Sequence, residues 1–433
     1  MVMGMFVTTI ELAQSSASKR TTYLRFILFL LAVMLIAKTG WFSRWGSEAQ
    51  NRSLHDFDGF YIAAQMVWRS NIEQAYHFAT MLPMQQQFDP SGSGYFLPWT
   101  YPPQFDLLVA PLVFLPLGTA YFLFTTGTLV LYLVTLRQVA GDCFALVLLL
   151  LFPAFAVTIA CGQNSFLTGT LIGLVCLSMQ KRQSLAGLPL GLMVIKPHLA
   201  VAFALYTFVA RRWEAVLVAA ATVVVTSALA TVLLGSGVWT AFFEGVQESR
   251  IFLESGLYPT HRMISTYAAL SSFGFPAWAA FAGQGVSAIV ALAVVCLAIR
   301  RGFAPRQALG LTAIASMLIS PYAYDYDLTV FGIGIALLLP DILRLGTERE
   351  RAAIYGLSFI TAVFGLAQVA RFAAQYGSGM PYAQYGSNMP YEMVRNALSV
   401  AGLTLPAILG LTWRILLRDY KSRPLTQTVC AAG

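Results

Sequence analysis

The sequence predicts an all-α polytopic membrane protein, and three observations support this fold class. Of the 433 residues, 58% are hydrophobic and only 11% are charged, and the mean hydropathy is +0.68. Soluble domains carry roughly 25% charged residues. Apolar runs recur along the chain, many of them near the length of about 20 residues that crosses a hydrocarbon core. Lys and Arg residues gather in short clusters between these runs. A water-soluble globular protein is therefore excluded.

The formal net charge of +8 does not indicate nucleic-acid binding. The basic residues follow the ends of apolar runs instead of one face of a helix, which is typical of cytoplasmic loops beside membrane spans. The five cysteines are scattered and show no CxxC spacing, so they predict neither a disulfide framework nor a metal site. We therefore expect membrane lipids as partners, and no nucleic acid.

The order of the apolar runs predicts a bundle of about 12 transmembrane or half-membrane helices. The predicted segments are 23–42, 104–136, 143–160, 164–180, 185–195, 199–210, 213–234, 276–299, 307–319, 328–340, 352–371 and 395–417. The first run follows Lys19, Arg20 and Arg25 as a signal peptide would, but it is long and lacks a small-residue cleavage site. We interpret it as a retained span. Pro111 and Pro116 are expected to interrupt the second segment.

The basic clusters set the orientation. With both termini in the cytoplasm, every cluster between predicted spans falls on the cytoplasmic side. The chain then divides into a cytoplasmic tail, 1–22, a single integral membrane domain, 23–417, and a second cytoplasmic tail, 418–433. The larger loops are expected on the outer face, at 43–103, 235–275 and 372–394. Chemistry is therefore expected on that face.

The first predicted outer loop contains an amphipathic helix, 56–68. Its apolar residues, among them Phe57, Phe60 and Tyr61, recur at helical spacing, which predicts an interfacial helix on the outer leaflet. Asp56 and Asp58 stand at its start. Either carboxylate could act as a general base, and either could simply cap the helix; the residues alone favour neither interpretation.

Three further breaks place polar residues between apolar runs, where irregular backbone is tolerated only if it lines protein or a cavity. Lys196, before Pro197, predicts a phosphate or carboxylate binder, and snorkelling toward lipid headgroups is the alternative. Gln163 and Asn164 could bind a sugar hydroxyl or cap the next helix. Outside these breaks, Arg262, which follows His261, could contact a lipid phosphate or be an ordinary loop residue.

The third break, 320–327, is rich in tyrosines and carboxylates. Asp325 and Asp327 lie among Tyr322, Tyr324 and Tyr326, which is typical of a carbohydrate-binding surface. Two carboxylates could also hold a divalent cation, so we expect no cofactor, with a divalent cation as the minor alternative. The motifs of soluble enzymes, such as phosphate-binding loops and nucleophile elbows, do not occur.

Five motifs follow one another in an order that resembles glycosyltransferase family 87. They are Asp56-Phe57 with Tyr61, Ala63 and Ala64; Tyr101-Pro102 with Pro111 and Pro116; Gly162-Gln163-Asn164; Ile195-Lys196-Pro197; and Ser320-Pro321. The resemblance covers roughly residues 55 to 330. It implies a GT-C-like bundle that transfers a hexose, mannose in this family, with inversion from a polyprenyl-phosphate-linked donor to a lipid or glycolipid hydroxyl. The implied location is the bacterial inner membrane, with a periplasmic active site.

The resemblance also implies roles for individual residues. Asp56 aligns with the family's proposed catalytic aspartate and is the first choice of base, with Asp58 second. The other roles rest on the chemistry of the residues and not on the resemblance: Lys196, with help from His198 or Arg262, is expected to hold the donor phosphate. The sugar or acceptor is assigned to Tyr61, Tyr101, Gln163, Asn164, Tyr324, Asp325 and Asp327. Many members carry Trp and His after Ser-Pro, where this chain has Tyr324 and Tyr326, so the sugar and the acceptor stay open.

Two other functions are compatible with the sequence. Discontinuous helices in two parts of a chain also mark the substrate sites of secondary transporters. A transporter or flippase of a polar or lipid-linked substrate is therefore the main alternative. A noncatalytic scaffold that docks another membrane protein is the third hypothesis.

Overall fold

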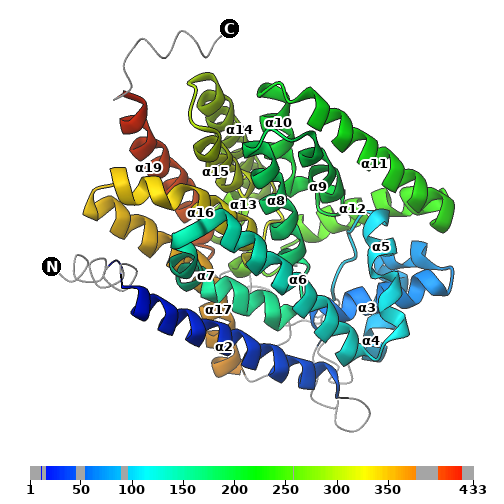
Figure 1. Cartoon of the computed structure of the whole chain (residues 1–433). Coiled ribbons are helices and arrows are strands. Elements are labelled where there is room, and N and C mark those ends of the chain that lie inside the picture. Colours follow the sequence, from blue (N-terminus) through cyan, green and yellow to red (C-terminus); the bar gives the residue numbers. More distant parts are fainter. Residues whose placement is uncertain are drawn as a thin grey trace.

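The computed structural model describes residues 11, 16–44, 54–88, 96–256, 258–376 and 398–421. Within these residues the chain is helical and contains no strand; Met263 and Tyr324 form one isolated β-bridge. The all-α prediction is confirmed (Figure 1). Most of the predicted tails, 1–22 and 418–433, and of the predicted loop 372–394 lies outside the described residues.

Seven described segments are long and apolar enough to cross a membrane, which confirms the polytopic membrane fold. They are Ala17–Phe42, Leu117–Cys161, Trp213–Leu234, Ala277–Arg300, Asp325–Leu345, Glu348–Arg371 and Ala401–Tyr420. Three shorter apolar segments accompany them, at Pro103–Phe114, Ser165–Gln180 and Ser184–Ile195.

Most α-helices follow the predicted apolar runs, whereas those at Phe78–Phe88, Gly237–Glu254 and Thr266–Ser272 lie inside segments predicted as outer loops. Those before the first polar break are α2 (Ala17–Phe42), α3 (Asp56–Trp68), α4 (Phe78–Phe88), α5 (Pro103–Val109), α6 (Leu117–Ala140) and α7 (Phe144–Cys161). The next are α8 (Ser165–Gln180), α9 (Gly187–Leu192), α10 (Val201–Val209), α11 (Trp213–Leu234), α12 (Gly237–Glu254) and α13 (Thr266–Ser272). The last are α14 (Ala277–Arg300), α15 (Pro305–Ser316), α16 (Leu328–Leu345), α17 (Glu348–Tyr376) and α19 (Ala401–Lys421).

Short 3₁₀ helices join these elements. They are η2 (Ile72–Tyr76), η3 (Ala110–Phe114), η4 (Gly141–Cys143), η5 (Ser184–Ala186), η6 (Met193–Ile195), η7 (Pro197–Leu199), η8 (Thr260–Arg262) and η9 (Asp325–Asp327). Pro111 and Pro116 lie at these interruptions, as predicted. Pro111 lies near the start of η3, which follows α5, and α6 begins directly after Pro116. Segment 104–136 is thus divided into α5, η3 and α6.

The bundle has a buried centre and an apolar exterior. In α16, 14 of 18 residues are buried, whereas in α11 only two of 22 are, Ala215 and Ala230. Exposed side chains such as Val224, Val232 and Leu233 make the surface of α11 apolar, as contact with lipid requires. Helices α15 and α16 pack closely together. The polar break 320–327 lies between them in the sequence.

Helix α3 has the predicted bounds, but protein covers it. Nine of its 13 residues are buried, and it packs against α4, α5, η2 and η3. Its apolar residues therefore face neighbouring helices instead of the outer leaflet predicted from the amphipathic stripe. Only its last turn is open, where the Trp68 side chain is 57% exposed. Helices α3, α4 and α5 form a group beside α12, at the right of Figure 1.

Candidate active site

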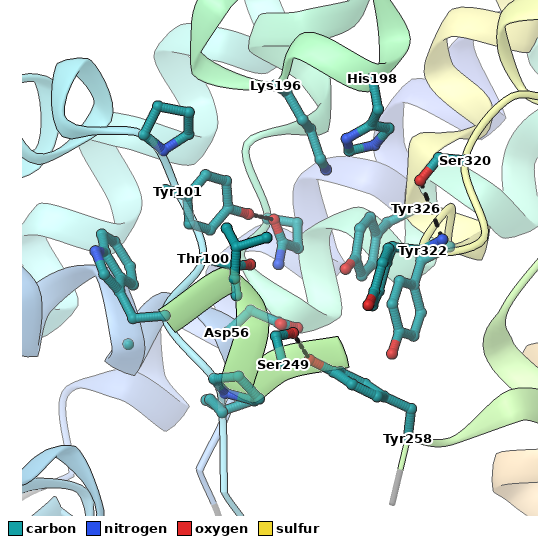
Figure 2. A pocket seen from close by; sticks show the side chains of 18 of the residues that line it. Asp56, Thr100, Tyr101, Lys196, His198, Ser249, Tyr258, Ser320, Tyr322 and Tyr326 are labelled. Carbon is teal, nitrogen blue, oxygen red and sulfur yellow. Dashed lines mark hydrogen bonds between the residues drawn. The ribbon is translucent and has the colours of Figure 1, made fainter. Parts of the chain in front are cut away.

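A cavity of about 430 Å³ lies where the polar breaks meet. This volume is within the usual range of ligand sites, roughly 300–1,000 Å³. Its walls come from the start of α3, the irregular segment 96–102, the break before α10, the helix α12 and the segment before η9. Figure 2 shows Lys196 and His198 entering the cavity on the side opposite Asp56 and Ser249. Segments separated by over 200 residues thus build one site.

Asp56 is the first residue of α3 and lines the cavity. Among the described residues it forms no ion pair, in contrast to Asp325 and Asp327. Its carboxylate still interacts electrostatically with Tyr101, Arg262 and Tyr326. A half-buried carboxylate that forms no ion pair with a described residue is a candidate proton acceptor.

Asp58 occupies a different place. It is fully buried, and its Oδ2 accepts a hydrogen bond from the backbone N–H of His55 at 2.9 Å, as in a capping box. It does not line the cavity. The capping interpretation therefore holds for Asp58, and its assignment as second candidate base has no support in its position.

The corner after α7 brings Tyr101 and Gln163 together. Gly162 ends α7 in the left-handed conformation, with φ 70°, and a Cβ there would lie 2.6 Å from the Cβ of Phe57. Only glycine fits this turn without strain. The Tyr101 hydroxyl donates to Gln163 Oε1 at 2.9 Å, and both side chains line the cavity. Asn164 lies just behind, fully buried, and its Oδ1 is 3.5 Å from Lys196 Nζ.

The break between α9 and α10 directs Lys196 inward. Pro197 cannot continue a helix, and Lys196 adopts an extended φ of −149° between η6 and η7. The Lys196 ammonium lies 2.5 Å from Asp327 Oδ1 and 4.9 Å from the ring centre of Tyr326. His198 lines the same wall, and burial lowers its pKa to about 4, so its imidazole is neutral near pH 7.

The turn η9 neutralises both cations of the cavity. Asp327 pairs with Lys196, and Asp325 accepts from the Arg262 guanidinium at 2.9 and 3.2 Å. The Tyr326 ring lies against both cations, 4.9 Å from Lys196 Nζ and 5.7 Å from the guanidinium carbon of Arg262. Buried charges of this kind are stable only when they are paired.

This geometry corrects two assignments. Asp325 and Asp327 were predicted to bind the sugar or the acceptor, but both are buried in ion pairs and neither lines the cavity. Tyr61 was predicted there too, yet its hydroxyl donates to the Leu115 carbonyl at 2.9 Å, away from the cavity. Tyr324 does line the cavity, stacked on Tyr326 with ring centres 5.2 Å apart.

One wall of the cavity was not predicted. Phe242, Val246, Ser249 and Phe252 follow one face of α12, and Tyr258 and Tyr322 continue this wall (Figure 2). Ser249 and Tyr258 share a hydrogen bond. These four α12 residues have helical spacing, which is the sequence signal from which this wall could have been predicted.

Helix α12 is held in place from outside the cavity. Glu248 accepts a hydrogen bond from the backbone N–H of Phe78 at 2.9 Å, and lies 3.1 Å from the His77 ring. Gly245 lets α12 approach Tyr76, since a Cβ there would lie 2.7 Å from the Tyr76 carbonyl oxygen. In the described part of the chain, no group of three or more His, Cys, Asp or Glu side chains could hold a metal ion.

Comparison with known proteins identifies the family. The model of glycosyltransferase family 87 matches residues 99–321, about half of the chain. The match includes Tyr101, Gln163, Lys196 and Arg262, whereas Asp56 lies before it. Comparisons with curated proteins and with solved structures gave no match. With a polytopic helical bundle and a polar cavity inside the matched region, the chain belongs to glycosyltransferase family 87 and is a membrane glycosyltransferase.

Proposed function

We propose that this glycosyltransferase moves a sugar, mannose in the first instance, from a polyprenyl-phosphate donor to a hydroxyl of a lipid or glycolipid. The observation that carries the proposal is that Asp56, free of an ion pair among the described residues, shares one cavity with Lys196 and Arg262. A base for the acceptor and cations for a phosphate are the groups that such a transfer requires.

The reaction can be written with these groups. The acceptor oxygen attacks the anomeric carbon and forms the new glycosidic bond, while the bond from that carbon to the phosphate oxygen breaks. The bonding electrons leave on the polyprenyl phosphate, and Asp56 takes the proton of the acceptor hydroxyl. Attack on the face opposite the phosphate inverts the anomeric configuration. Tyr101, Gln163 and Tyr324, which line the cavity, are proposed to position the sugars.

The phosphate of the sugar donor would bind N–H groups that Lys196 and Arg262 do not use in their ion pairs. An ammonium has three N–H donors, and Lys196 directs two of them to Asp327 and Asn164. Arg262 uses Nε and Nη2 for Asp325 and Cys161, which leaves Nη1 for a ligand. Neutral His198 would add an N–H donor instead of a charge. We propose that no resident metal is needed, with a divalent cation as the alternative to test.

We further propose the bacterial inner membrane, cytoplasmic termini and a cavity on the outer side. Two charged networks support this orientation. Arg306 and Arg344 pair with Asp341, and Arg418 pairs with Glu350. The first network joins the start of α15 to the end of α16, and the second joins the start of α17 to the end of α19. The cavity lies beside the other ends of α15 and α16, and arginine-rich ends of spans are typically cytoplasmic.

The test is transfer of radiolabelled mannose from polyprenyl-phosphate-mannose to a total lipid extract by the purified protein in nanodiscs. We expect a labelled lipid from the wild type and a loss of about 10²–10⁴-fold in Asp56→Asn, the usual contribution of a general base. The matched control is Asp142→Asn, since that carboxylate is 95% exposed and outside the cavity.

Three results of these assays would contradict parts of the proposal or favour its alternative. Equal rates for Asp56→Asn and Asp142→Asn would remove Asp56 as the base. Absence of product with several donors, with and without divalent cations, would contradict the proposed donor. Vesicle uptake of a polar or lipid-linked substrate without any product would instead favour the transporter alternative.

A further inference from the structure

The cavity wall at residues 96–102 has no helix or strand of its own, although every one of its residues lines the cavity. Backbone groups outside regular structure need other hydrogen-bond partners. The buried Gln85 supplies two at one end of the wall, because its amide donates to the Leu97 carbonyl at 2.7 Å and accepts from the Leu97 N–H at 2.9 Å.

The other end of the wall is held by Asp106, a fully buried carboxyl group on α5. Its Oδ1 lies 2.9 Å from Trp99 Nε1, and its Oδ2 lies 2.7 Å from the Tyr76 hydroxyl. The same hydroxyl is 3.0 Å from the backbone carbonyl oxygen of Tyr101. Three contacts thus connect Asp106 to the cavity wall.

The number of protons decides which form of Asp106 fits these contacts. The Trp99 indole has one N–H, the Tyr76 hydroxyl has one proton, and the Tyr101 carbonyl can only accept. If Asp106 were ionised, the single Tyr76 proton would have to serve two acceptors. If Oδ2 carries a proton, Asp106 donates to Tyr76, Tyr76 donates to Tyr101, and each contact has one proton.

We propose that Asp106 is a neutral carboxylic acid in the folded protein at neutral pH, and that it is a positioning residue which fixes Tyr101 in the cavity through Tyr76 and Trp99. Tyr101 in turn holds Gln163 through its hydroxyl at 2.9 Å. The link to catalysis rests on the proposed function, whereas the protonation state of Asp106 does not.

The surroundings of Asp106 agree with a neutral acid. Tyr76 is the one titratable group that acts on it within the described residues, and no cation offsets its burial. The elements packed on α5 also carry Asp56, Asp58, Glu214, Glu244, Glu248, Arg250 and Glu254, none of which acts on Asp106. Helix α5 lies outside the seven candidate spans, and burial raises the pKa of Asp106 to about 8.

The first test needs no substrate. Infrared difference spectra of wild type against Asp106→Asn at pH 7 should show the carbonyl stretch of a protonated carboxylic acid that is lost in the variant. Asn keeps an oxygen for Trp99 and an N–H for Tyr76, so the variant should unfold near the wild-type temperature. Asp106→Leu, which removes both contacts, should unfold well below it. A carboxylate band instead of the acid band, or an Asp106→Asn protein that does not fold, would overturn the proposal.

The second test is the pH profile of transfer. As the pH rises above about 8, Asp106 ionises, and its carboxylate accepts the hydrogen bond of the Tyr76 hydroxyl. The Tyr101 carbonyl then has no donor. We expect the wild-type rate to fall by about tenfold relative to Asp106→Asn, the effect of one buried hydrogen bond. If the transfer rates of wild type and Asp106→Asn fell equally at high pH, this would show that Asp106 does not position Tyr101. If the infrared result holds but neither protein transfers sugar, the proposed donor fails and the protonation of Asp106 stands.

Discussion

At the scale of single residues, the cavity combines one carboxylate that lacks an ion pair among the described residues with two cations that are already paired. Asp56 is available to take a proton, whereas Lys196 and Arg262 are held by Asp327 and Asp325. A buried ion pair contributes little net stability, but breaking it by removal of one partner is costly. Loss of activity on mutating Lys196 alone would therefore not show whether it binds phosphate.

A double-mutant cycle separates the two roles of Lys196. Lys196→Met leaves Asp327 buried without its cation, and should lower the free energy of unfolding by about 3–5 kcal/mol. Lys196→Met combined with Asp327→Asn removes both charges, so thermal unfolding in detergent should return close to that of the wild type. If Lys196 holds the donor phosphate, the double variant should remain inactive in the transfer assay. An active double variant would show that Lys196 serves only as the partner of Asp327.

Seven of the 12 residues predicted for the site line the cavity, but their pairings were not predicted. Lys196, His198, Tyr101, Gln163 and Asp56 all line the cavity, since polar residues at breaks between apolar runs need protein or a cavity around them. Asp325 and Arg262 are 63 residues apart, and Asp327 and Lys196 are 131 apart. Which carboxylate meets which cation depends on how the helices pack, and no local pattern encodes this.

At the scale of elements, small residues allow the central helices to approach closely. Gly169 and Gly173 stand four residues apart on α8 and face α6, where a Cβ on Gly169 would lie 2.6 Å from the Tyr132 ring, and one on Gly173 would meet Thr135. Packing of this kind is typical of membrane helices, where backbones approach through glycine.

This contact predicts opposite effects for two chemically identical substitutions. Gly173→Ala should destabilise the protein by about 1–3 kcal/mol, because the added methyl group overpacks the α6–α8 interface. Gly285→Ala on α14 has nothing within 4 Å of the added Cβ, so it should be neutral or slightly stabilising. Thermal unfolding in detergent measures both. Equal unfolding temperatures for the two variants would contradict the described α6–α8 packing.

Element boundaries were predicted well where proline or a polar cluster sets them. The interruption at Pro111 and Pro116, the break at Lys196 and the polar segment before α16 all occur as expected. The surroundings of α3 were not predicted, because an apolar stripe shows that a face is buried without showing whether protein or lipid buries it.

At the scale of the whole molecule, the network around Asp341 and the cavity lie at opposite ends of α15 and α16, which supports the proposed orientation. Two exposed positions test it. Gln74 follows α3 near the cavity end, and Lys181 directly follows α8.

We expect Gln74→Cys to react with a membrane-impermeant maleimide in intact spheroplasts, and Lys181→Cys to react only after permeabilisation. The protein without an added cysteine gives the background, since Cys143, Cys161 and Cys176 are buried but Cys296 is only half-buried. The reverse pattern would invert the topology and place the cavity in the cytoplasm.

The ion pairs at η9 have a consequence for how the protein is made. Lys196 and Arg262 already have carboxylate partners within the same chain, so neither needs the charge of a ligand to be stable inside the protein. The bundle can therefore complete its assembly in the membrane without a bound donor. If the donor is a lipid-linked sugar, as we propose, the departing lipid phosphate would leave behind a neutralised wall, ready for the next turnover.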